Sequence, residues 1–493
     1  MTLHDLTILA IGRSWPPPTE AARLKTYTLN QAIIEGNHNT LTTFNKLAKY
    51  LREKPTDKKL PVLIDTADIS ARSTNDLLLG TTPTITVSDP ESAAETCIAL
   101  QKQTKFARVV GQVAEDLVTC GVGIFKVGSQ ASTPTIQAIP PEHWYPVAPR
   151  GAPMDLLAHV VAWTFEETQH QPTDLSAVSP KRYLYIEIHT TDAEGAGYIE
   201  HRLHNLSSEG KIGQALTADE ISAYPEFADL PAGRVKTGVT GPLVVPVFNR
   251  PSSRSAYGRP GISPVARADL EALEILLSVH ASTLWAFGRP DINAPKSAFI
   301  FDESRGRHIF QAGEAHMIRE GEQGVEPVVW DIQGAAMEAT IDRILDRIYE
   351  SLELSPALIS STKDGGGAES GKALRFRLLP TLAKVDRARD ALTGGIYCDG
   401  ISLVLSQASK LAASLPAGPA GVVAFEPEDV TIVWADSLPV DQDAQAERHA
   451  KLKTAALMST AASLRERGYS EEAIEAELVA IRSDLTEEGR PLL

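Results

Sequence analysis

The stretch SPVARADLEALEILLSVHASTLWAFG, residues 263–288, decides how this chain folds. Ser263 is a favourable N-cap, Pro264 suits the first turn and Gly288 suits the end, so the stretch predicts a helix over residues 264–287. A helix of these 24 residues would be about 36 Å long. Further along, AAMEATIDRILDRIYESLEL, residues 335–354, predicts a second helix of about 30 Å. Between them SAFIFDE, AHMIRE and VEPVVWDI predict short strands, so two long helices bracket a small β unit.

The rest of the chain surrounds this helix pair with mixed structure. Residues 20–53 have apolar residues at helical spacing, and residues 60–250 contain several short runs typical of antiparallel strands. After the second helix, the Gly-rich SSTKDGGGAESGKA predicts a mobile loop, and a helical region that Pro380 is expected to kink follows. A strand, VTIVW, and a charged helical tail come last. The sequence therefore predicts a helix-rich α+β fold of about two to four domains.

Composition and charge narrow the class of protein. The 493 residues are 43% hydrophobic and 22% charged, as in ordinary folded chains, and no window predicts a membrane-spanning helix. A formal charge of −16 argues against a protein that grips nucleic acid by neutralising phosphates. Cys97, Cys120 and Cys398 lie too far apart for a disulfide framework or a zinc site, and we expect them to be buried. With no convincing signal peptide at the N-terminus, we expect a reducing cytosol.

Several stretches, in a consistent order, resemble the portal proteins of tailed bacteriophages, in particular the Bacillus-siphophage-like portal family. They are NDLLLGTTPTITV (75–87), EDLVTCGVGIFKV (115–127), IQAIPPEHWYPV (136–147), LVVPVFNRPSSRSAYGRPGISPVARADLEALE (243–274) and VTIVWADSLPVDQDAQAERHAKLKTAALMS (430–459). Each is weak alone. Their order, together with the succession helix, β insert, helix, Gly-rich loop and helix, carries the resemblance.

The resemblance implies a ring-forming fold with wing, stem, clip and crown regions. The implied segments are an N-terminal arm and wing (1–256), a first stem helix (257–289), a clip (290–334), a second stem helix (335–355), a tunnel loop (356–373), a long wing helix (374–415) and a crown (416–493). Residues 1–60 match least.

The resemblance also implies a function without catalysis. Such a ring, usually a dodecamer, forms the DNA channel at one capsid vertex, nucleates capsid assembly and serves genome packaging and ejection. Its implied partners are double-stranded DNA, the terminase that hydrolyses ATP, the major capsid or scaffolding protein, and the head-tail connector, but no membrane. The implied location is the virion, after assembly in the host cytoplasm.

Four carboxylates recur at every fourth residue of the second predicted helix: Glu338, Asp342, Asp346 and Glu350. They form an acidic row, while apolar residues such as Ile341 and Ile348 form another side of the helix. Two interpretations remain open. The row is either a solvated face paired with Arg343 and Arg347, or a channel lining whose negative charge keeps DNA from sticking.

The Gly-rich loop and its flanks supply further candidates. The loop candidates are Lys363, Asp364, Gly365, Gly366, Gly367, Glu369 and Lys372. Arg375 and Arg377 follow, and such cations either touch DNA transiently or pair with carboxylates such as Glu369. In the implied clip, Phe310 and Trp330 belong either to a small core or to a contact with the connector.

Two rival functions are weighed against the portal hypothesis. Residues 366–373 satisfy GxxxxGK, but Ala373 replaces the hydroxyl that holds magnesium in a phosphate loop, and no buried strand is predicted before it. A P-loop-like nucleotide-binding enzyme is therefore disfavoured. The chain also lacks HExxH and GxSxG, so we expect no catalytic residues, cofactor or metal. The other rival is a structural capsid or baseplate protein that does not conduct DNA.

Overall fold

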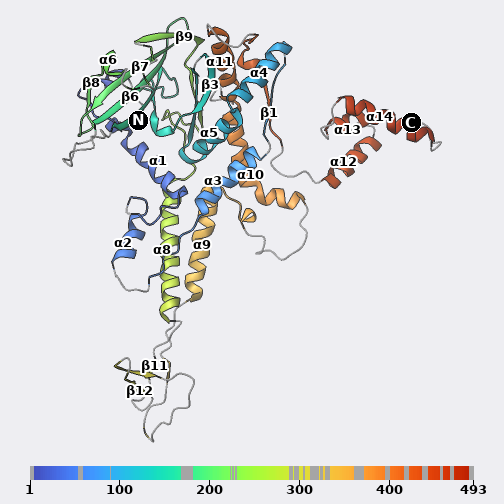
Figure 1. Ribbon diagram of the computed structural model, residues 1–493. Coiled ribbons are helices and arrows are strands. Elements are labelled where there is room, and N and C mark those ends of the chain that lie inside the picture. The colour runs from blue at the N-terminus through green and yellow to red at the C-terminus, as the bar shows by residue number, and fades with distance from the viewer. Residues whose placement is uncertain are drawn as a thin grey trace. The chain divides into compact units, whose positions relative to one another are not determined.

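A six-stranded antiparallel sheet is the largest β element of the computed structural model (Figure 1). The strands run in the order β4-β5-β6-β7-β8, and β9 pairs with β7. Their bounds are β4 (Trp144–Val147), β5 (Ala158–Glu167), β6 (Lys181–Thr191), β7 (Ala196–Leu206), β8 (Ile212–Ala215) and β9 (Arg234–Thr240). The antiparallel strands predicted within residues 60–250 are thus confirmed.

Both faces of this sheet are covered. Val160 and Ile186 pack with Leu9 of the short 3-10 helix η1 (Leu6–Leu9) on one face. On the other face, Val161 belongs to a buried cluster with Phe248 and Tyr257, which lie outside this sheet. Because neighbouring residues of a strand point to opposite faces, a strand buried on both sides has a nearly continuous apolar sequence.

The structure describes residues 5–487 with several gaps. The residues left undescribed are 1–4, 41, 54–58, 81, 89, 131, 168–180, 222–223, 225–226, 228–229, 232, 288–291, 294–298, 304–305, 311–320, 322–325, 328–333, 360–370, 395–399, 416–420, 436–441, 456–458, 467–470 and 488–493. The chain divides into two compact units. The first comprises Met1–Gly366 and Phe376–Ala435, and the second comprises Gly367–Arg375 and Asp436–Leu493.

A helical layer and a smaller sheet form the main core of the first unit. The sheet has the order β10-β2-β3. Elements of this part are α3 (Thr66–Leu79), α4 (Glu91–Gln103), α5 (Phe106–Cys120), β2 (Val122–Gln130), β3 (Thr133–Ala138), β10 (Val244–Phe248), α10 (Gly371–Thr393) and α11 (Gly400–Ser414). Cys97 and Cys120 are buried, as predicted, and Cys398 lies outside the described residues.

One glycine makes the turn from α5 into β2 possible. Gly121 has φ +88°, in the left-handed region, and a Cβ there would lie 2.5 Å from the carbonyl carbon of Arg259. Only glycine avoids both the steric penalty and the clash, so α5 ends at Cys120 and the chain reverses at once into β2.

Two long helices meet beside this core. They are α8 (Pro264–Phe287) and α9 (Gly334–Leu352), and they run antiparallel (Figure 1). The predicted first helix is confirmed, and the second begins and ends within two residues of its predicted bounds. Described strands of the segment between them are β11 (Ile292–Asn293), β12 (Phe299–Asp302), β13 (Arg307–Phe310) and β14 (Glu326–Pro327).

The region after the Gly-rich loop differs from the prediction. One helix over residues 374–415 was expected, but α10 ends at Thr393 and α11 begins at Gly400. Gly394 has φ +103° and Gly400 has φ +42°, and such left-handed backbone cannot continue a right-handed helix. Pro380 lies inside α10.

Shorter elements complete the chain. The first unit also contains η2 (Pro18–Glu20), α1 (Ala21–Ile34), α2 (Asn45–Arg52), β1 (Thr84–Val87), η3 (Pro141–His143), α6 (Ala218–Ile221), η5 (Pro356–Leu358), η6 (Pro427–Asp429) and β15 (Val430–Val433). The second contains α12 (Gln442–Thr454), α13 (Thr460–Glu466) and α14 (Glu471–Glu487). Of the helices described, none is both long and apolar enough to cross a bilayer.

Candidate functional site

The candidate site is built on the α8–α9 pair. Ser263 Oγ accepts a hydrogen bond from the Ala266 N–H at 3.1 Å, which caps the N-terminus of α8 as predicted. The two helices share a core in which Leu270, Leu273 and Ile348 are fully buried. Since apolar residues recur at helical spacing on both chains, each helix buries one stripe and leaves the rest of its surface available.

The acidic row lies on the surface of α9. Glu338, Asp342, Asp346 and Glu350 are all exposed, whereas Ile348 is buried against α8. Residues four apart advance by about 40° around a helix, so the row slants across the outer side of α9. The separation of an acidic side from an apolar side is as predicted. Which surface the row faces in an assembly stays a prediction.

Arg347, one of the two expected arginine partners of the row, binds elsewhere. Arg347 reaches across to α8 and pairs with Asp269, with 3.0 Å between Nη2 and Oδ1. Within the described residues, the carboxylates of Glu338, Asp346 and Glu350 make no ion pair. Arg347 therefore joins the two helices and does not neutralise the row.

Polar side chains of α8 fix the N-terminal segment to one side of that helix. Glu271 Oε1 accepts hydrogen bonds from the N–H groups of Lys46 at 2.6 Å and Leu47 at 3.3 Å. The residue before α2, Phe44, cannot cap a helix, so the α8 carboxylate supplies the missing acceptors at the positive end of α2. Sequence reasoning missed this contact.

The same side of α8 holds the chain that follows α2. Ser282 Oγ accepts from the Leu60 N–H at 3.0 Å, and Ser278 Oγ accepts from the Val62 N–H at 2.9 Å. The polar residues Glu271, Glu274, Ser278 and Ser282 recur at helical spacing along α8. That spacing was the available signal that one side of α8 binds backbone.

A buried ion pair completes this contact. His38 Nδ1 lies 2.5 Å from Glu274 Oε1, and Nε2 lies 2.6 Å from the carbonyl oxygen of Ile33. Both ring nitrogens face acceptors, an arrangement that favours the protonated ring, in which both nitrogens donate. Burial alone would lower the pKa of His38, but the hydrogen bond to Glu274 and its charge outweigh burial and raise the pKa.

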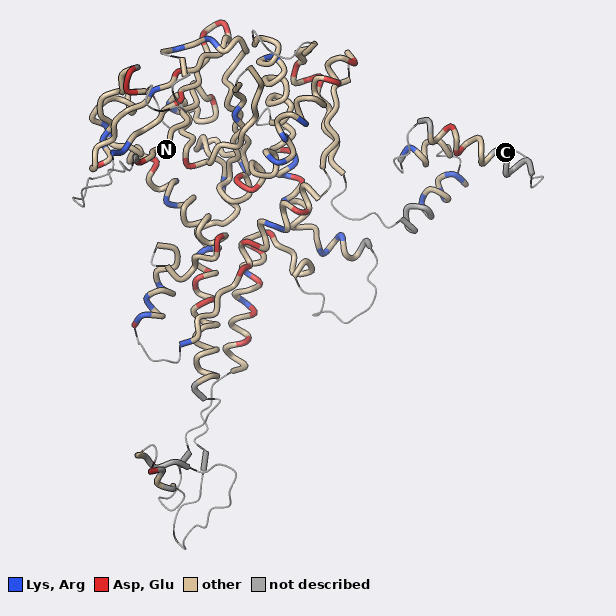
Figure 2. The backbone as a smooth tube through the Cα atoms, in the orientation of Figure 1, with Lys and Arg blue, Asp and Glu red and all other residues tan. Residues whose placement is uncertain are grey.

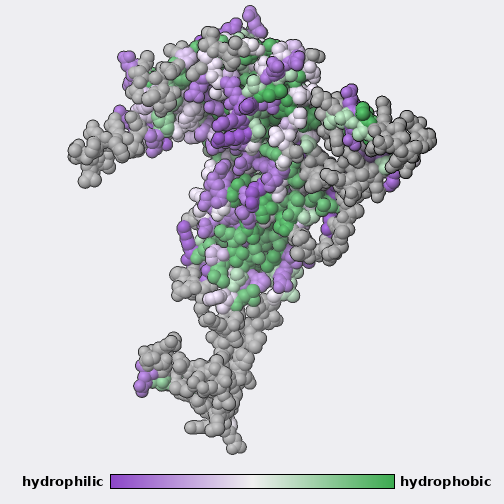
Figure 3. All heavy atoms as spheres, turned by 45° about the vertical axis from the view of Figure 1, so that its right-hand side comes forward, coloured by the Kyte–Doolittle hydropathy of each residue, from purple (hydrophilic) through white to green (hydrophobic). Residues whose placement is uncertain are grey.

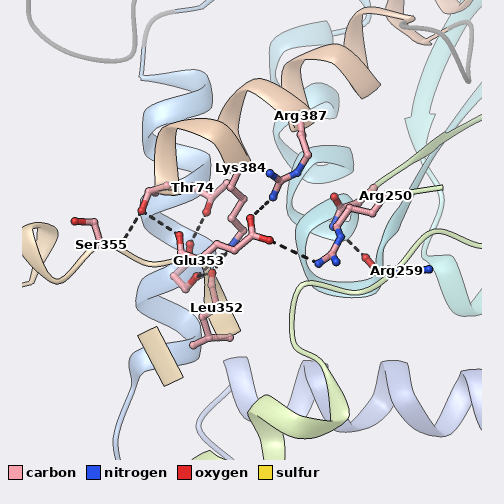
Figure 4. Close-up of polar contacts among 11 residues, drawn as sticks. Thr74, Arg250, Arg259, Leu352, Glu353, Ser355, Lys384 and Arg387 are labelled. Carbon is pink, nitrogen blue, oxygen red and sulfur yellow. Dashed lines mark hydrogen bonds and ion pairs between the residues drawn. The ribbon is translucent and has the colours of Figure 1, made fainter. Parts of the chain in front are cut away.

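The junction where α9 leads toward α10 is held by a second polar cluster (Figure 4). Glu353, at φ +53°, lies between two arginines: it pairs with Arg387, and its Oε1 lies 3.6 Å from Arg250 Nη1. Lys384 Nζ donates to Ser70 Oγ at 3.0 Å and to the Leu352 carbonyl at 3.2 Å. Burial lowers the pKa of Lys384 to about 8.

Hydroxyl groups tie the same junction to α10. Thr381 Oγ1 donates to the Glu353 carbonyl at 3.1 Å and accepts from the Ser355 N–H at 2.9 Å. Ser355 Oγ donates to the Arg377 carbonyl at 2.8 Å, so these three hydroxyl-mediated hydrogen bonds join α10 to the end of α9 in addition to the contacts of Lys384 and Arg387. The part of α10 that belongs to the first unit is thereby fixed to the end of α9.

The remaining predicted residues divide into described and undescribed ones. Arg375 and Arg377 lie on α10 and are exposed. Phe310 lies on β13, where its backbone pairs with Phe299 of β12. The position of Lys372 is within α10, but its side chain is outside the description. Outside the described residues altogether are Lys363, Asp364, Gly365, Gly366, Gly367, Glu369 and Trp330.

A polar network within the sheets has the residue types of an active site, but its charged groups bind one another. Glu187 on β6 accepts from Lys126 on β2 at 3.0 Å, and its other oxygen lies 2.6 Å from His189. Burial opposes the charge of Glu187, but the contacts with His189 and Lys126 prevail and lower its pKa. Among the described side chains, no His, Cys, Asp and Glu cluster is arranged to hold a metal.

Comparisons with known proteins give little further information. No family model and no curated protein matches the chain. A chain in a solved structure of the neck of an empty GTA particle, computed with C6 symmetry, is 12% identical and superposes with a TM-score of 0.37. The match covers 92% of this chain and 94% of that chain. The functional assignment therefore depends on the residues and geometry of this chain itself.

Proposed function

We propose that this chain is a portal-type subunit of a tailed-phage particle, acting as a ring through which double-stranded DNA passes at one capsid vertex. The single observation that carries the proposal is the α8–α9 pair, whose helices bracket the strands β11 to β14 and are followed by the Gly-rich loop and α10. This succession is the one by which the sequence resembles portal proteins. A long helix pair with a shared core is suited to form a wall when copies stand side by side.

The proposal assigns mechanical roles and no catalysis. The ring would nucleate capsid assembly, dock a separate terminase, and later join the head-tail connector. The Gly-rich loop with Lys372, Arg375 and Arg377 is proposed to lie nearest the DNA, because cations contact phosphates without reading bases. Phe310 and Trp330 are proposed for the contact with the connector. In such a ring, the acidic row has two possible places, the channel or the contact between copies.

The elements that precede the Gly-rich loop weigh against the nucleotide-binding rival. A phosphate loop follows a buried strand and opens a helix, so its backbone N–H groups can surround the phosphates. Here the described residues before the loop form α9 and the 3-10 helix η5, and none of them is a strand. The GxxxxGK spacing therefore lacks the structural context that its chemistry needs.

The proposal is tested on the purified full-length chain. We expect rotationally symmetric rings with an open axial hole in class-averaged electron micrographs, and no specific ATP turnover when nucleotide is titrated. Saturable ATP hydrolysis would favour the enzyme. Symmetric particles with a closed centre would favour the structural protein that does not conduct DNA.

A further inference from the structure

Two exposed faces of opposite charge lie on different helices of the first unit (Figure 2). The outer side of α2 presents Lys46, Lys49 and Arg52, all exposed and opposite the buried Leu47 and Ala48. We call these three cations the basic face. The acidic row of α9 is the other face. These cations stand on a chain whose net charge is −16.

Charges on both faces, Lys46 and Arg52 on one and Glu338 and Asp346 on the other, have no ion pair within the described part of the chain. Lys49 pairs only with the exposed Glu53 at 3.3 Å, and no ion pair is described for Lys46 or Arg52. The carboxylates of Asp346 and Glu338 are likewise without an ion pair among the described residues. Each face therefore remains able to bind an opposite charge from outside the chain.

The helices that carry the two faces, α2 and α9, lie on opposite sides of α8 (Figure 1). Glu271 of α8 caps α2, and Asp269 of α8 binds Arg347 of α9. Residues two apart on a helix point about 200° away from each other, so α2 and α9 contact nearly opposite sides of α8. A neighbouring copy placed beside the first would therefore meet one face with the other.

The two faces also lie at the same height along α8. Glu271 and Asp269 are separated by about 3 Å along the helix axis, which puts Lys46 level with Arg347 and hence with Asp346. From Lys46 the chain runs along α8 in the direction of its C-terminal end, because Leu60 binds Ser282 there. Because α9 runs antiparallel to α8, its row continues from Asp346 toward Glu338 in the same direction.

We propose that the basic face of one copy docks on the acidic row of the next copy, in a head-to-tail contact that repeats around a ring. That the repeated contact closes into a ring rests on the portal-type function proposed above. A contact between two different faces is heterologous, and it closes into a ring when copies are related by rotation alone. Rotation about an axis parallel to α8 keeps heights unchanged, so faces at the same height meet.

The geometry favours a second copy over other occupants of these faces. A contact with a second copy uses both faces and requires them to lie at the same height. DNA would bind the basic face alone, and its binding would not require the acidic row at that height. Apolar surface accompanies the charges: Val265 and Leu284 of α8 have 60% and 53% of their surface exposed, and Figure 3 shows apolar area along the helix pair. That area would supply most of the attraction.

The ion pairs would set the register of the contact more than its strength. Exposed pairs contribute little individually and are screened by salt, with a Debye length of about 10 Å at 0.1 M. Complementary charges instead orient the partners and exclude wrong pairings, since like charges brought together repel. Placing like charges on both sides should therefore abolish the contact even where apolar area remains.

Two charge-reversed full-length variants test the inference. The first carries Lys46→Glu, Lys49→Glu and Arg52→Glu, and the second carries Glu338→Lys, Asp342→Lys and Asp346→Lys. Sedimentation velocity should show that neither variant forms rings alone, because each would bring like charges together. An equimolar mixture should restore rings, because each reversed face then meets its complement on the other chain. In the restored rings the two variants should alternate, so that each ring contains an even number of subunits.

A matched variant controls for the change in net charge. Lys102→Glu, Arg108→Glu and Arg254→Glu lower the net charge as the first variant does, on exposed residues elsewhere, and rings should persist. Glu95→Lys, Glu115→Lys and Glu194→Lys raise it as the second variant does, with the same expectation. Circular dichroism checks that each variant is folded. If a reversed variant does not fold, neutral glutamine and asparagine versions are compared with wild type. The inference then requires that rings of the neutral variant dissociate at a higher protein concentration than wild-type rings at low salt. An unchanged dissociation concentration overturns it.

Other outcomes separate this inference from the proposed function. Rings that persist in the α9 variant while DNA passage changes would place the row in the channel and overturn the inference alone. Rings that persist in the α2 variant while DNA retention is lost would make the basic face a DNA contact, with the same consequence. A folded mixture that fails to assemble also overturns it. A wild-type chain that never forms rings contradicts the proposed function itself.

Discussion

At the scale of single residues, the buried charges of this chain serve as connections between elements. Glu187 joins β6 to β2 through Lys126, and Glu274 joins α8 to the N-terminal segment through His38. A buried charge survives only with hydrogen-bonding partners close by, so each pair fixes the relative position of the elements it joins. The sequence shows these residues as isolated charges, and only the tertiary contacts identify their partners.

We expect Glu187→Gln to destabilise the first unit by about 3–5 kcal/mol at neutral pH, because Lys126 and His189 lose a buried counter-charge. The folded-state pKa of Glu187 lies below the ordinary value of 4.5, so its stabilisation is present above that pH and is lost as pH falls. Urea unfolding between pH 3 and 7 should therefore show a weaker acid dependence in the variant. Glu200→Gln, on β7, is the control; a variant as acid-sensitive as wild type would contradict this role.

Thr381 offers a second test at this scale. Its hydroxyl is buried and satisfies both the Glu353 carbonyl and the Ser355 N–H, so Thr381→Val should cost about 1–3 kcal/mol. Thr340→Val, on the exposed side of α9, should change stability by less than about 0.5 kcal/mol. Thermal unfolding measures both. Equal effects would mean that the junction is not held by these hydrogen bonds.

At the scale of elements, the α8–α9 pair depends on a shared apolar stripe. Leu270→Ala should destabilise the pair by about 2–5 kcal/mol, because Leu270 is fully buried between the helices. Leu284, on the same helix, is 53% exposed, and its replacement by alanine should cost far less. Hydrogen exchange of the α8 and α9 amides would detect the loss locally. Unchanged protection in the Leu270 variant would contradict the packing.

The sequence could predict those elements whose signals, such as caps and apolar spacing, lie within the element itself. Ser263, Pro264 and the apolar spacing mark α8 within the helix itself, so its bounds were predictable. The pairing of β1 with β15, from Thr84–Val433 to Val87–Val430, joins segments far apart in sequence and has no local signal. The break between α10 and α11 is hard to predict because an apolar, helix-like pattern continues on both sides of Gly394.

The candidate site was predictable to a similar degree. The spacing of Glu338 and Asp342 was enough to place the acidic row on one side of α9. It could not reveal that Arg347 is engaged by Asp269, because that contact joins two helices separated by the whole β insert. The basic face of α2 was overlooked for a related reason, since its importance depends on its position across α8.

At the scale of the whole molecule, assembly is the property on which the account depends. Each chain carries a net charge of −16, so copies repel one another unless opposite charges meet at their contacts. The basic face of one copy and the acidic row of the next would bring opposite charges together at each contact. Because these pairs set the register more than the strength of the contact, we expect the concentration at which wild-type rings dissociate to rise only modestly with salt, which mass photometry over a salt series would measure. A dissociation concentration that falls steadily with salt would indicate an apolar contact without charge pairing.

The most direct measurement of the central claim is class-averaged electron microscopy of the purified full-length chain, recorded over a range of concentrations and at low salt. The account predicts annular particles with rotational symmetry, an open centre and α8–α9 pairs side by side around it. A chain that stays monomeric at every concentration and salt tested, or that forms particles with no axial opening, would contradict it.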